Sequence, residues 1–351
     1  MSHSIALNFE DGVTRFVECR PDETIVDACY RAAINIPLDC RDGACGTCKC
    51  RVEAGRYHGG SYVEDALTKE EAAEGLALAC QMRPLSDLVL AIAASSEACK
   101  TGRQSFEAPL RAVERLSETS IAFSLEAPPG LAFLPGQYVN IRVPDTDQRR
   151  SYSFSSAPGA EALSFLVRDI PRGMMSTWLR EVGLREVAAP RTPLELAGPA
   201  GSFYLREVRR PLLFLAGGTG LAPFLSMLGK LAATGCAQSI HLVYGVTIDA
   251  DLVEVARLEE FAARIPGFTF ATCVAAEGST HPRKGYVTAH IDPAHLNDGE
   301  VDVYLCGPPP MVDAIRAWLG ERGMTPANFY YEKFSPSGAV TAIGEIHRRA
   351  A

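Results

Sequence analysis

The arrangement of four cysteines limits what the first part of this chain can fold into. Cys40, Cys45 and Cys48 lie on one short loop, and 31 residues (positions 49 to 79) separate the last of them from Cys80. This Cys-x4-Cys-x2-Cys spacing is typical of plant-type [2Fe-2S] ligands, and small residues between the cysteines let backbone N–H groups turn toward sulfur. Structural zinc sites usually use two Cys-x2-Cys pairs, and the second pair is missing here. The loop therefore predicts an iron-sulfur cluster, with zinc as the alternative.

The remaining cysteines point to a reducing environment. The chain has 11 cysteines, an odd number, and its first residues lack the features of an export signal. Because disulfides form mainly in exported proteins, we expect reduced thiols and a cytoplasmic protein. No apolar stretch approaches the ~20 residues of a membrane span, so we expect no membrane contact. The thiols outside the motifs are expected to be small hydrophobic side chains: Cys19, Cys29, Cys50, Cys99, Cys236 and Cys273.

The net charge of -8 is concentrated near the N-terminus. Residues 1–97 hold 16 Asp or Glu against 9 Lys or Arg, whereas residues 98–351 hold 26 against 25. Negative charge on the first segment repels nucleic acid and attracts a basic protein surface. We therefore expect a protein partner to dock there and no nucleic-acid partner, with a merely solubilising acidic surface as an equal alternative.

Three segments with different patterns follow one another. The expected parts are 1–97, a linker at 98–105, 106–206, 207–334 and a tail at 335–351. In the first segment, a hairpin, a helix and a second helix over 66–80, which carries Cys80, predict a small sheet with the cysteine loop at its edge. Short strands separated by Pro and Gly predict an antiparallel barrel in the second. Buried strands alternating with helices predict a doubly wound parallel sheet in the third.

The barrel segment carries two patterns that suit a phosphate-bearing cofactor. In the run Arg150 to Ser153, alternation puts Arg150 and Tyr152 on the opposite strand face from the two serines. A guanidinium suits pyrophosphate, an aromatic ring suits a flat ring system, and a hydroxyl can meet a ring nitrogen. Gly173 opens a helix whose free N–H groups can hold phosphate. Alone, the four-residue run would be better explained as an ordinary strand with an exposed arginine.

The third segment carries a nucleotide pattern. Gly217 to Gly220 link a buried strand to a helix, which predicts a dinucleotide pyrophosphate site, although the turn lacks the full Gly-x-Gly-x-x-Gly pattern and plain connection geometry is the alternative. Gly245 to Asp251 follow the next strand with acidic residues, which favours NADH over NADPH. Cys306 ends a strand at the edge where ligands bind, with a buried structural thiol as the alternative. None of the 7 histidines forms a metal-binding pair, and they are assigned no role.

These motifs, in this order, resemble the reductase components of bacterial aromatic-ring dioxygenases, most closely those of the benzoate type. The likeness runs from CRDGACGTC through RSYSFSS and LAGGTGLAPF to VDVYLCGPPPM and EKF, which is nearly the whole chain. It implies a multidomain α+β and α/β protein. Its parts would be an N-terminal β-grasp [2Fe-2S] ferredoxin domain, an antiparallel β-barrel that binds FAD, and a doubly wound parallel-sheet domain that binds NADH.

The resemblance also implies roles for individual residues. Tyr152 would stack on the flavin ring, Ser153 would approach flavin N5, and Cys306 would lie near the nicotinamide. Phe334 would cover the flavin, although in plant reductases the stacking aromatic is terminal and 17 residues follow Phe334 here. The implied catalytic residues are Ser153, Cys306, Glu332 and Phe334. The implied cofactor ligands are Cys40, Cys45, Cys48 and Cys80 for the cluster; Arg150, Ser151, Tyr152, Ser153, Val167, Arg168, Gly173, Met174, Met175, Ser176 and Phe334 for FAD; and Gly217, Gly218, Thr219, Gly220, Gly245, Cys306, Gly307 and Pro308 for NADH.

Together these features lead to a hypothesis about function. A hydride carries two electrons and a plant-type cluster accepts one at a time, so a flavin is needed between them. We hypothesise a monomeric reductase that passes electrons from NADH to FAD, to the cluster and to a Rieske-type oxygenase. The alternatives are a reductase of a di-iron phenol or methane monooxygenase and a flavin NADH dehydrogenase with a structural zinc module.

Overall fold

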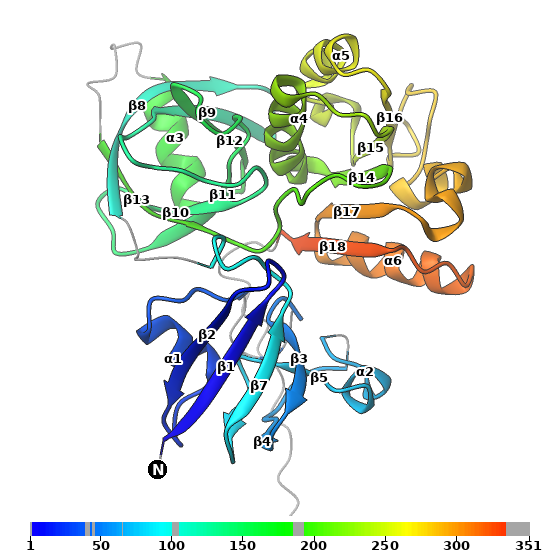
Figure 1. Cartoon of the computed structure of the whole chain (residues 1–351). Helices are drawn as coiled ribbons and strands as arrows, with labels where there is room; N and C mark the ends of the chain where they lie inside the picture. Colours follow the sequence, from blue (N-terminus) through cyan, green and yellow to red (C-terminus); the bar gives the residue numbers. More distant parts are fainter. Residues whose placement is uncertain are drawn as a thin grey trace, which may run out of the picture. The chain divides into compact units, whose positions relative to one another are not determined.

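The structure is a computed structural model, shown in Figure 1. It describes residues 2–38, 43, 46–64, 66–99, 105–184 and 193–334. Cys40, Cys45, linker residues 100–104 and the tail 335–351 lie outside the described residues. The chain divides into two compact units, Met1–Val208 with Ala222–Gly235 and Arg209–Leu221 with Cys236–Ala351.

The first sheet is a mixed, five-stranded one. Its strands, in spatial order, are β2 (Thr14–Cys19), β1 (His3–Phe9), β7 (Leu88–Ile92), β3 (Lys49–Ala54) and β5 (Leu76–Leu78). β1 and β2 form the predicted antiparallel hairpin, and β7 pairs parallel with β1. Alternate side chains of these strands pack with buried residues of helix α1 (Ile25–Arg31) in one apolar core. A helix packed on a mixed sheet of this order confirms the β-grasp prediction.

The helix that we predicted over 66–80 is much shorter. α2 (Lys69–Ala73) begins with a capping box, in which Thr68 and Glu71 each accept a hydrogen bond from the other's backbone N–H. Gly75 follows the helix with a φ of 87°, which an L side chain rarely adopts. The chain then enters β5, so Cys80 follows a strand and the prediction that it lies on a helix is wrong. Two short strands, β4 (Tyr57–His58) and β6 (Arg83–Pro84), pair beside this region.

The second sheet is the predicted antiparallel barrel. Its strands, in spatial order, are β11 (Arg149–Ser153), β10 (Tyr138–Arg142), β13 (Pro193–Ala200), β8 (Ser105–Arg115), β9 (Ser120–Glu126) and β12 (Ala162–Arg168). A bridge between Phe154 and Phe165 links the two ends of the sheet and closes it. Helix α3 (Met174–Leu184) contributes Met175 and Leu179 to the apolar core. The helix is thus held by packing, with its N-terminus beside the strand that carries Arg150.

The third sheet is parallel throughout. Its strands, in spatial order, are β16 (Phe268–Val274), β15 (Ile240–Val246), β14 (Leu212–Gly217), β17 (Asp302–Gly307) and β18 (Asn328–Lys333). The chain moves outward in one direction through β14, β15 and β16, and then in the other through β17 and β18 (Figure 1). Ligands of open α/β sheets bind where the strand order reverses, at the carboxyl ends of the strands. Here that point lies between β14 and β17, and the doubly wound prediction is confirmed.

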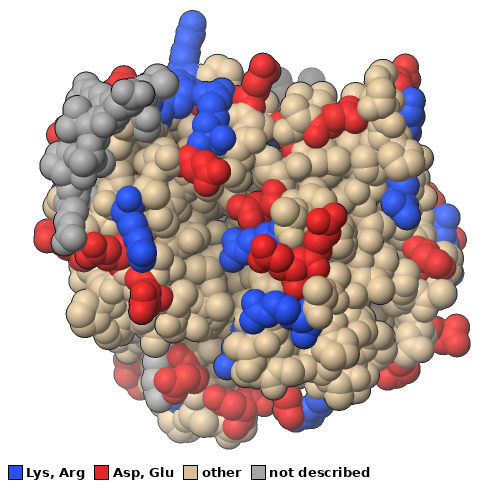
Figure 2. Space-filling model, turned by 90° about the horizontal axis from the view of Figure 1, so that it is seen from above, with Lys and Arg blue, Asp and Glu red and all other residues tan. Residues whose placement is uncertain are grey.

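Helices and 3-10 turns connect the strands of the third sheet. They are η1 (Gly218–Leu221), α4 (Ala222–Thr234), η2 (Asp249–Asp251), α5 (Val255–Arg264), η3 (Val287–His290), η4 (Pro293–Gly299) and α6 (Pro309–Glu321). Within the residue ranges given above, no helix combines the length and apolar character that a membrane crossing requires. Figure 2 shows one face of the molecule, on which Lys and Arg side chains lie among Asp and Glu.

Candidate functional site

The two predicted cluster ligands that the structure describes, Cys48 and Cys80, lie close together because two strands pair beside them. β3 and β5 pair Lys49 with Leu78, which puts Cys48 and Cys80 at adjoining strand ends. The N–H of Ala79 donates to the carbonyl of Cys48 at 3.0 Å. Both cysteines are buried, with 3% and 5% of their surface exposed. Two adjacent buried cysteines are what a [2Fe-2S] cluster requires from this half of its ligand set, so the described residues fit the cluster.

Gly43, in the cysteine loop, has a steric explanation. Gly43 has a φ of 80°, and a Cβ on it would lie 2.7 Å from the carbonyl oxygen of Ser61. The carbonyl of Gly43 also accepts a hydrogen bond from Val63 at 3.2 Å, which ties the loop to the next segment. On the other side, Lys49 Nζ lies 2.6 Å from Glu71 Oε1 on α2. The described residues before and after Cys48 are therefore each tied to a neighbouring segment, Gly43 to Val63 and Lys49 to Glu71.

The cysteines outside the motifs behave as expected. Five are buried free thiols, whereas Cys236 is partly exposed. Burial raises the pKa of the Cys19, Cys50 and Cys99 thiols to about 12. A thiol with so high a pKa stays protonated and unreactive near neutral pH, which suits a packing role.

The two barrel patterns that were predicted to suit a phosphate meet in the structure. Arg150 Nη2 lies 3.7 Å from Met174 Sδ, so the guanidinium is at the N-terminus of α3. A Cβ on Gly173 would lie 2.6 Å from Ser176 Oγ and 3.0 Å from the carbonyl oxygen of Ile170, which leaves room only for glycine. The hydroxyl of Ser176 donates to carbonyls inside this turn, at 3.2 Å to each of two oxygens. A cationic fork beside a free helix N-terminus fits a cofactor pyrophosphate.

Tyr152 shares the strand face of Arg150. It is half-buried, and its ring meets Phe123 edge to face at 5.9 Å between centroids. Burial raises the pKa of its phenol, so the ring stays neutral. Of the other predicted FAD residues, Val167 and Met175 are buried in the barrel core, whereas Arg168 and Met174 are exposed.

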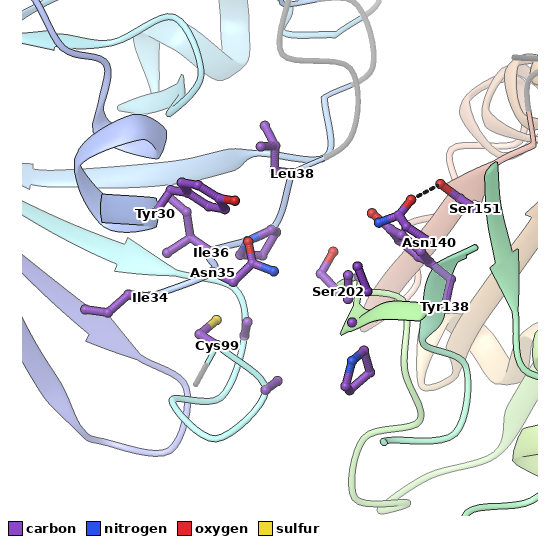
Figure 3. Close-up of a pocket in the computed structure, with 18 of the residues that line it drawn as sticks. Tyr30, Ile34, Asn35, Ile36, Leu38, Cys99, Tyr138, Asn140, Ser151 and Ser202 are labelled. Atoms are coloured by element: carbon purple, nitrogen blue, oxygen red, sulfur yellow. Dashed lines mark hydrogen bonds between the residues drawn. The ribbon is translucent and has the colours of Figure 1, made fainter. Parts of the chain in front are cut away.

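The two serines of the run lie on the opposite face, as the alternation predicts. Ser151 and Ser153 pair with Asn140 and Tyr138, whereas Arg150 and Tyr152 pair with buried residues of β10. The hydroxyl of Ser151 donates to Asn140 Oδ1 at 2.8 Å, on the wall of a pocket of about 500 Å³ (Figure 3). On this strand, the structure therefore places neither Ser151 nor Ser153 on the face of Arg150 and Tyr152.

The glycine turn and the Cys306 loop meet at the point where the strand order reverses. Ala216 and Cys306 are register partners on β14 and β17. A Cβ on Gly220 would lie 2.4 Å from the carbonyl oxygen of Cys306, so the two backbones are in contact. Gly218 has a φ of 55°, and a Cβ on it would meet nothing within 4 Å. The open side of the turn is thus available for the close approach of a pyrophosphate.

Cys306 and Glu332 are neighbours in register on β17 and β18. The Cys306 thiol is fully buried, and burial raises its pKa, with the Glu332 carboxylate as a second cause. The thiol is therefore protonated. Phe334 follows β18, and its N–H donates to the Gly307 carbonyl at 2.8 Å, which brings it to the same edge of the sheet.

The sequence also predicts that Gly245 and the acidic residues that follow it lie beside the nucleotide. A Cβ on Gly245 would lie 2.5 Å from Val287 Cγ2, so close packing already requires a glycine there. Asp249, in the acidic run after β15, accepts a hydrogen bond from the hydroxyl of Ser279 at 2.8 Å. The carboxylate is thereby held at the carboxyl end of the sheet, where a ribose would bind.

The sequence patterns missed Met311. Its sulfur occupies the space beside Gly217 and Gly307, where a Cβ would lie 2.5 Å and 2.8 Å away. The residue stands in the CGPPPM run, but only the three-dimensional contact shows that it touches two loops.

Two histidines outside the predicted site stack on each other, His241 on β15 of the third sheet and His295 on η4. The rings of His241 and His295 are 3.6 Å apart between centroids, at an interplanar angle of 13°. His241 Nδ1 is 2.7 Å from Thr269 Oγ1. Burial lowers the pKa of His241 to about 4, and the neighbouring His295 acts in the same direction.

Comparisons with known proteins agree with the three domains. Three families match: the 2Fe-2S iron-sulfur cluster binding domain over residues 8–85, the oxidoreductase FAD-binding domain over 107–204, and the oxidoreductase NAD-binding domain over 214–317. The protein thus uses a [2Fe-2S] cluster, FAD and NAD as cofactors.

Several relatives match along almost their whole length. The chain is 54% identical over 340 residues to the toluate 1,2-dioxygenase electron transfer component of Pseudomonas putida, covering 96% of this chain and 100% of the relative. It is 48% identical over 341 residues to the 2-halobenzoate 1,2-dioxygenase electron transfer component of Burkholderia cepacia, covering 96% and 99%. A propane 2-monooxygenase reductase component of Rhodococcus jostii is 31% identical over 344 residues, covering 94% and 91%.

A solved structure agrees in fold. The crystal structure of the Amycolatopsis cytochrome P450 reductase is 33% identical, covers 95% of this chain and 99% of its own, and gives a TM-score of 0.68. The dioxygenase relatives are the more similar in sequence. From its domains and from these relatives, the chain belongs to the family of electron transfer components of aromatic-ring dioxygenases.

Proposed function

We propose that this protein takes a hydride from NADH and delivers single electrons to a Rieske-type oxygenase that hydroxylates an aromatic acid of the benzoate class. The observation that carries the proposal is the 54% identity to the toluate component, which extends over 96% of this chain. The relatives that act with toluate and with 2-halobenzoate dioxygenases support a benzoic acid carrying small ring substituents as the substrate of the partner. The aromatic ring itself would bind to the oxygenase.

The barrel would hold FAD through residues that the structure brings together. Arg150 and the N-terminal N–H groups of α3 would bind the pyrophosphate, because both lie at the same end of the helix. Tyr152 would pack against the flat ring system, with its orientation fixed by Phe123. When bound, FAD supplies the exchange between two-electron and one-electron chemistry that the nicotinamide and the cluster require.

The third sheet would hold NADH at the point between β14 and β17. The turn Gly217–Gly220 would bind the pyrophosphate on its open side, at Gly218. Asp249 would accept a hydrogen bond from a ribose hydroxyl and repel a 2'-phosphate, which favours NADH over NADPH. The buried, protonated Cys306 would keep charge away from the nicotinamide end.

Cys40, Cys45, Cys48 and Cys80 would ligate the cluster, and the acidic first segment would dock the oxygenase. Exposed carboxylates stand close to Cys48, because Glu70 lies on α2, Glu74 caps the C-terminus of this helix, and Glu71 links the helix to the residue after Cys48. Negative charge at this position would steer a basic patch of the oxygenase toward the cluster.

The test is reconstitution with purified oxygenases. We expect NADH-driven hydroxylation of benzoate, toluate or 2-halobenzoate when this protein is mixed with a Rieske-type oxygenase. A di-iron hydroxylase in a parallel reaction is the control, since a monooxygenase reductase is also a relative. Turnover with the di-iron enzyme alone would contradict the proposal.

A further inference from the structure

One side chain joins the two loops that meet at the strand-order reversal. Met311 is the third residue of α6, and its sulfur lies against the backbone of both β14 and β17 at their carboxyl ends. A Cβ on Gly217 would lie 2.5 Å from this sulfur, and a Cβ on Gly307 would lie 2.8 Å from it. The sulfur therefore occupies the side-chain space of two glycines at once.

The base of Met311 is fixed while its tip is adaptable. Its N–H donates to the Pro308 carbonyl at 2.9 Å, and its side chain packs against the core cluster of this sheet. A thioether side chain has several rotatable bonds and a polarizable sulfur, which lets it fit the irregular space beside two touching backbones. The neighbouring contact between Gly220 and the Cys306 carbonyl is rigid, because it joins two backbones without a side chain between them.

We propose that Met311 is a positioning residue that holds the Gly217–Gly220 turn and the Cys306–Pro308 loop in place by packing its sulfur on a glycine of each. The proposal rests on the function given above, in which the turn binds the pyrophosphate of NADH and the loop adjoins the nicotinamide. Under that assignment, the Met311 side chain fixes where the nicotinamide end lies relative to the pyrophosphate end. Hydride transfer depends on such alignment, and a misplacement of about 1 Å can cost about 100-fold in rate.

The space that the sulfur fills explains why the size of the side chain at position 311 matters. Met311→Ala removes the sulfur that fills the side-chain space of both Gly217 and Gly307 and leaves a cavity into which the loops can relax. Met311→Leu keeps most of the volume and the apolar character, and such swaps are tolerated well. The two variants therefore differ in whether the space beside Gly217 and Gly307 stays filled.

The experiment measures flavin bleaching in the full-length holoprotein by stopped flow, over a range of NADH concentrations. We expect Met311→Ala to lower the limiting rate at least 10-fold and to raise the deuterium isotope effect with NADH labelled at C4, because hydride transfer becomes slower than the other steps. Met311→Leu should stay within about 3-fold of the wild type. Calorimetry with ADP-ribose, which lacks the nicotinamide, should show less than about 3-fold change in Kd for either variant.

Met324→Ala is the matched control. Met324 follows α6 and packs against the same core cluster, away from the two glycine loops. It should lower the melting temperature without changing the limiting rate or the isotope effect. A Met311→Ala protein with the wild-type limiting rate would overturn the inference, as would Met311→Leu behaving like Met311→Ala. If the wild-type flavin itself is not bleached by NADH, the proposed function fails instead, so the two failures are distinguishable.

Discussion

Gly220→Ala tests whether backbone contact at the strand-order reversal controls hydride transfer. The new Cβ would lie 2.4 Å from the Cys306 carbonyl oxygen and 2.8 Å from its carbon, whereas ordinary contact begins near 3.4 Å. The new Cβ is therefore about 1 Å too close to backbone atoms, and these cannot rotate away as a side chain can. The turn and the loop must therefore separate by about that distance, and we expect the limiting rate of NADH-driven flavin bleaching to fall about 100-fold.

Gly218→Ala provides the comparison within the same turn. Its Cβ meets nothing within 4 Å, so the only structural cost is the left-handed backbone at a φ of 55°, about 1 kcal/mol. The substituent points to the open side, so we expect weaker NADH binding with a limiting rate within a few-fold of the wild type. Stopped-flow traces over a range of NADH concentrations separate the two parameters. A wild-type limiting rate in Gly220→Ala would refute the reasoning, and so would an equal loss in both variants.

Three further outcomes are expected. Cys80→Ala should remove the cluster's visible absorption and leave NADH-dependent flavin bleaching largely intact; unchanged cluster absorption would exclude Cys80 as a ligand. Glu74→Lys should raise the KM for the oxygenase several-fold at low salt and less at high salt, because exposed charges are screened, whereas Glu259→Lys on the exposed surface of α5 should not. His241 stays neutral in the fold, with a pKa of about 4 against an ordinary 6.5, so the unfolded chain binds the proton first and stability is lost as pH falls from about 6.5 toward about 4. The full pKa shift corresponds to about 3 kcal/mol in the free energy of unfolding, and partial exposure of the ring reduces the expected loss to about 1 kcal/mol. Urea unfolding of the wild type and of His241→Phe at pH 7.5 and pH 5 should show that loss only in the wild type.

The domain types could be predicted from the sequence because their signals are local. Cysteine spacing, the change from strand-rich to alternating patterns, and the glycine turn each depend on neighbouring residues. The helix over 66–80 was wrong in its second half because Gly75 stops it and Leu76–Leu78 finds a partner in β3, a pairing that depends on residues far along the chain. The opposite faces of Arg150 and Ser151 followed from strand alternation.

Contacts between residues that are far apart in the sequence could not be predicted in this way. The sulfur of Met311 reaches Gly217, and the N-terminus of α3 reaches Arg150, over separations that no spacing rule describes. The stacking of His241 on His295 is of the same kind, since the two residues are unremarkable in sequence. The motifs thus identified the parts of the site, and the tertiary packing determined which parts meet.

The pairing of β3 with β5 has a consequence for how the protein matures. Peptide hydrogen bonds, including the one between Ala79 and the carbonyl of Cys48, bring two of the predicted ligands together. The first segment also has an apolar core of its own. We therefore expect the polypeptide to fold before the metal arrives, so that a cell short of iron would accumulate a folded flavoprotein that oxidises NADH but has no outlet to its oxygenase.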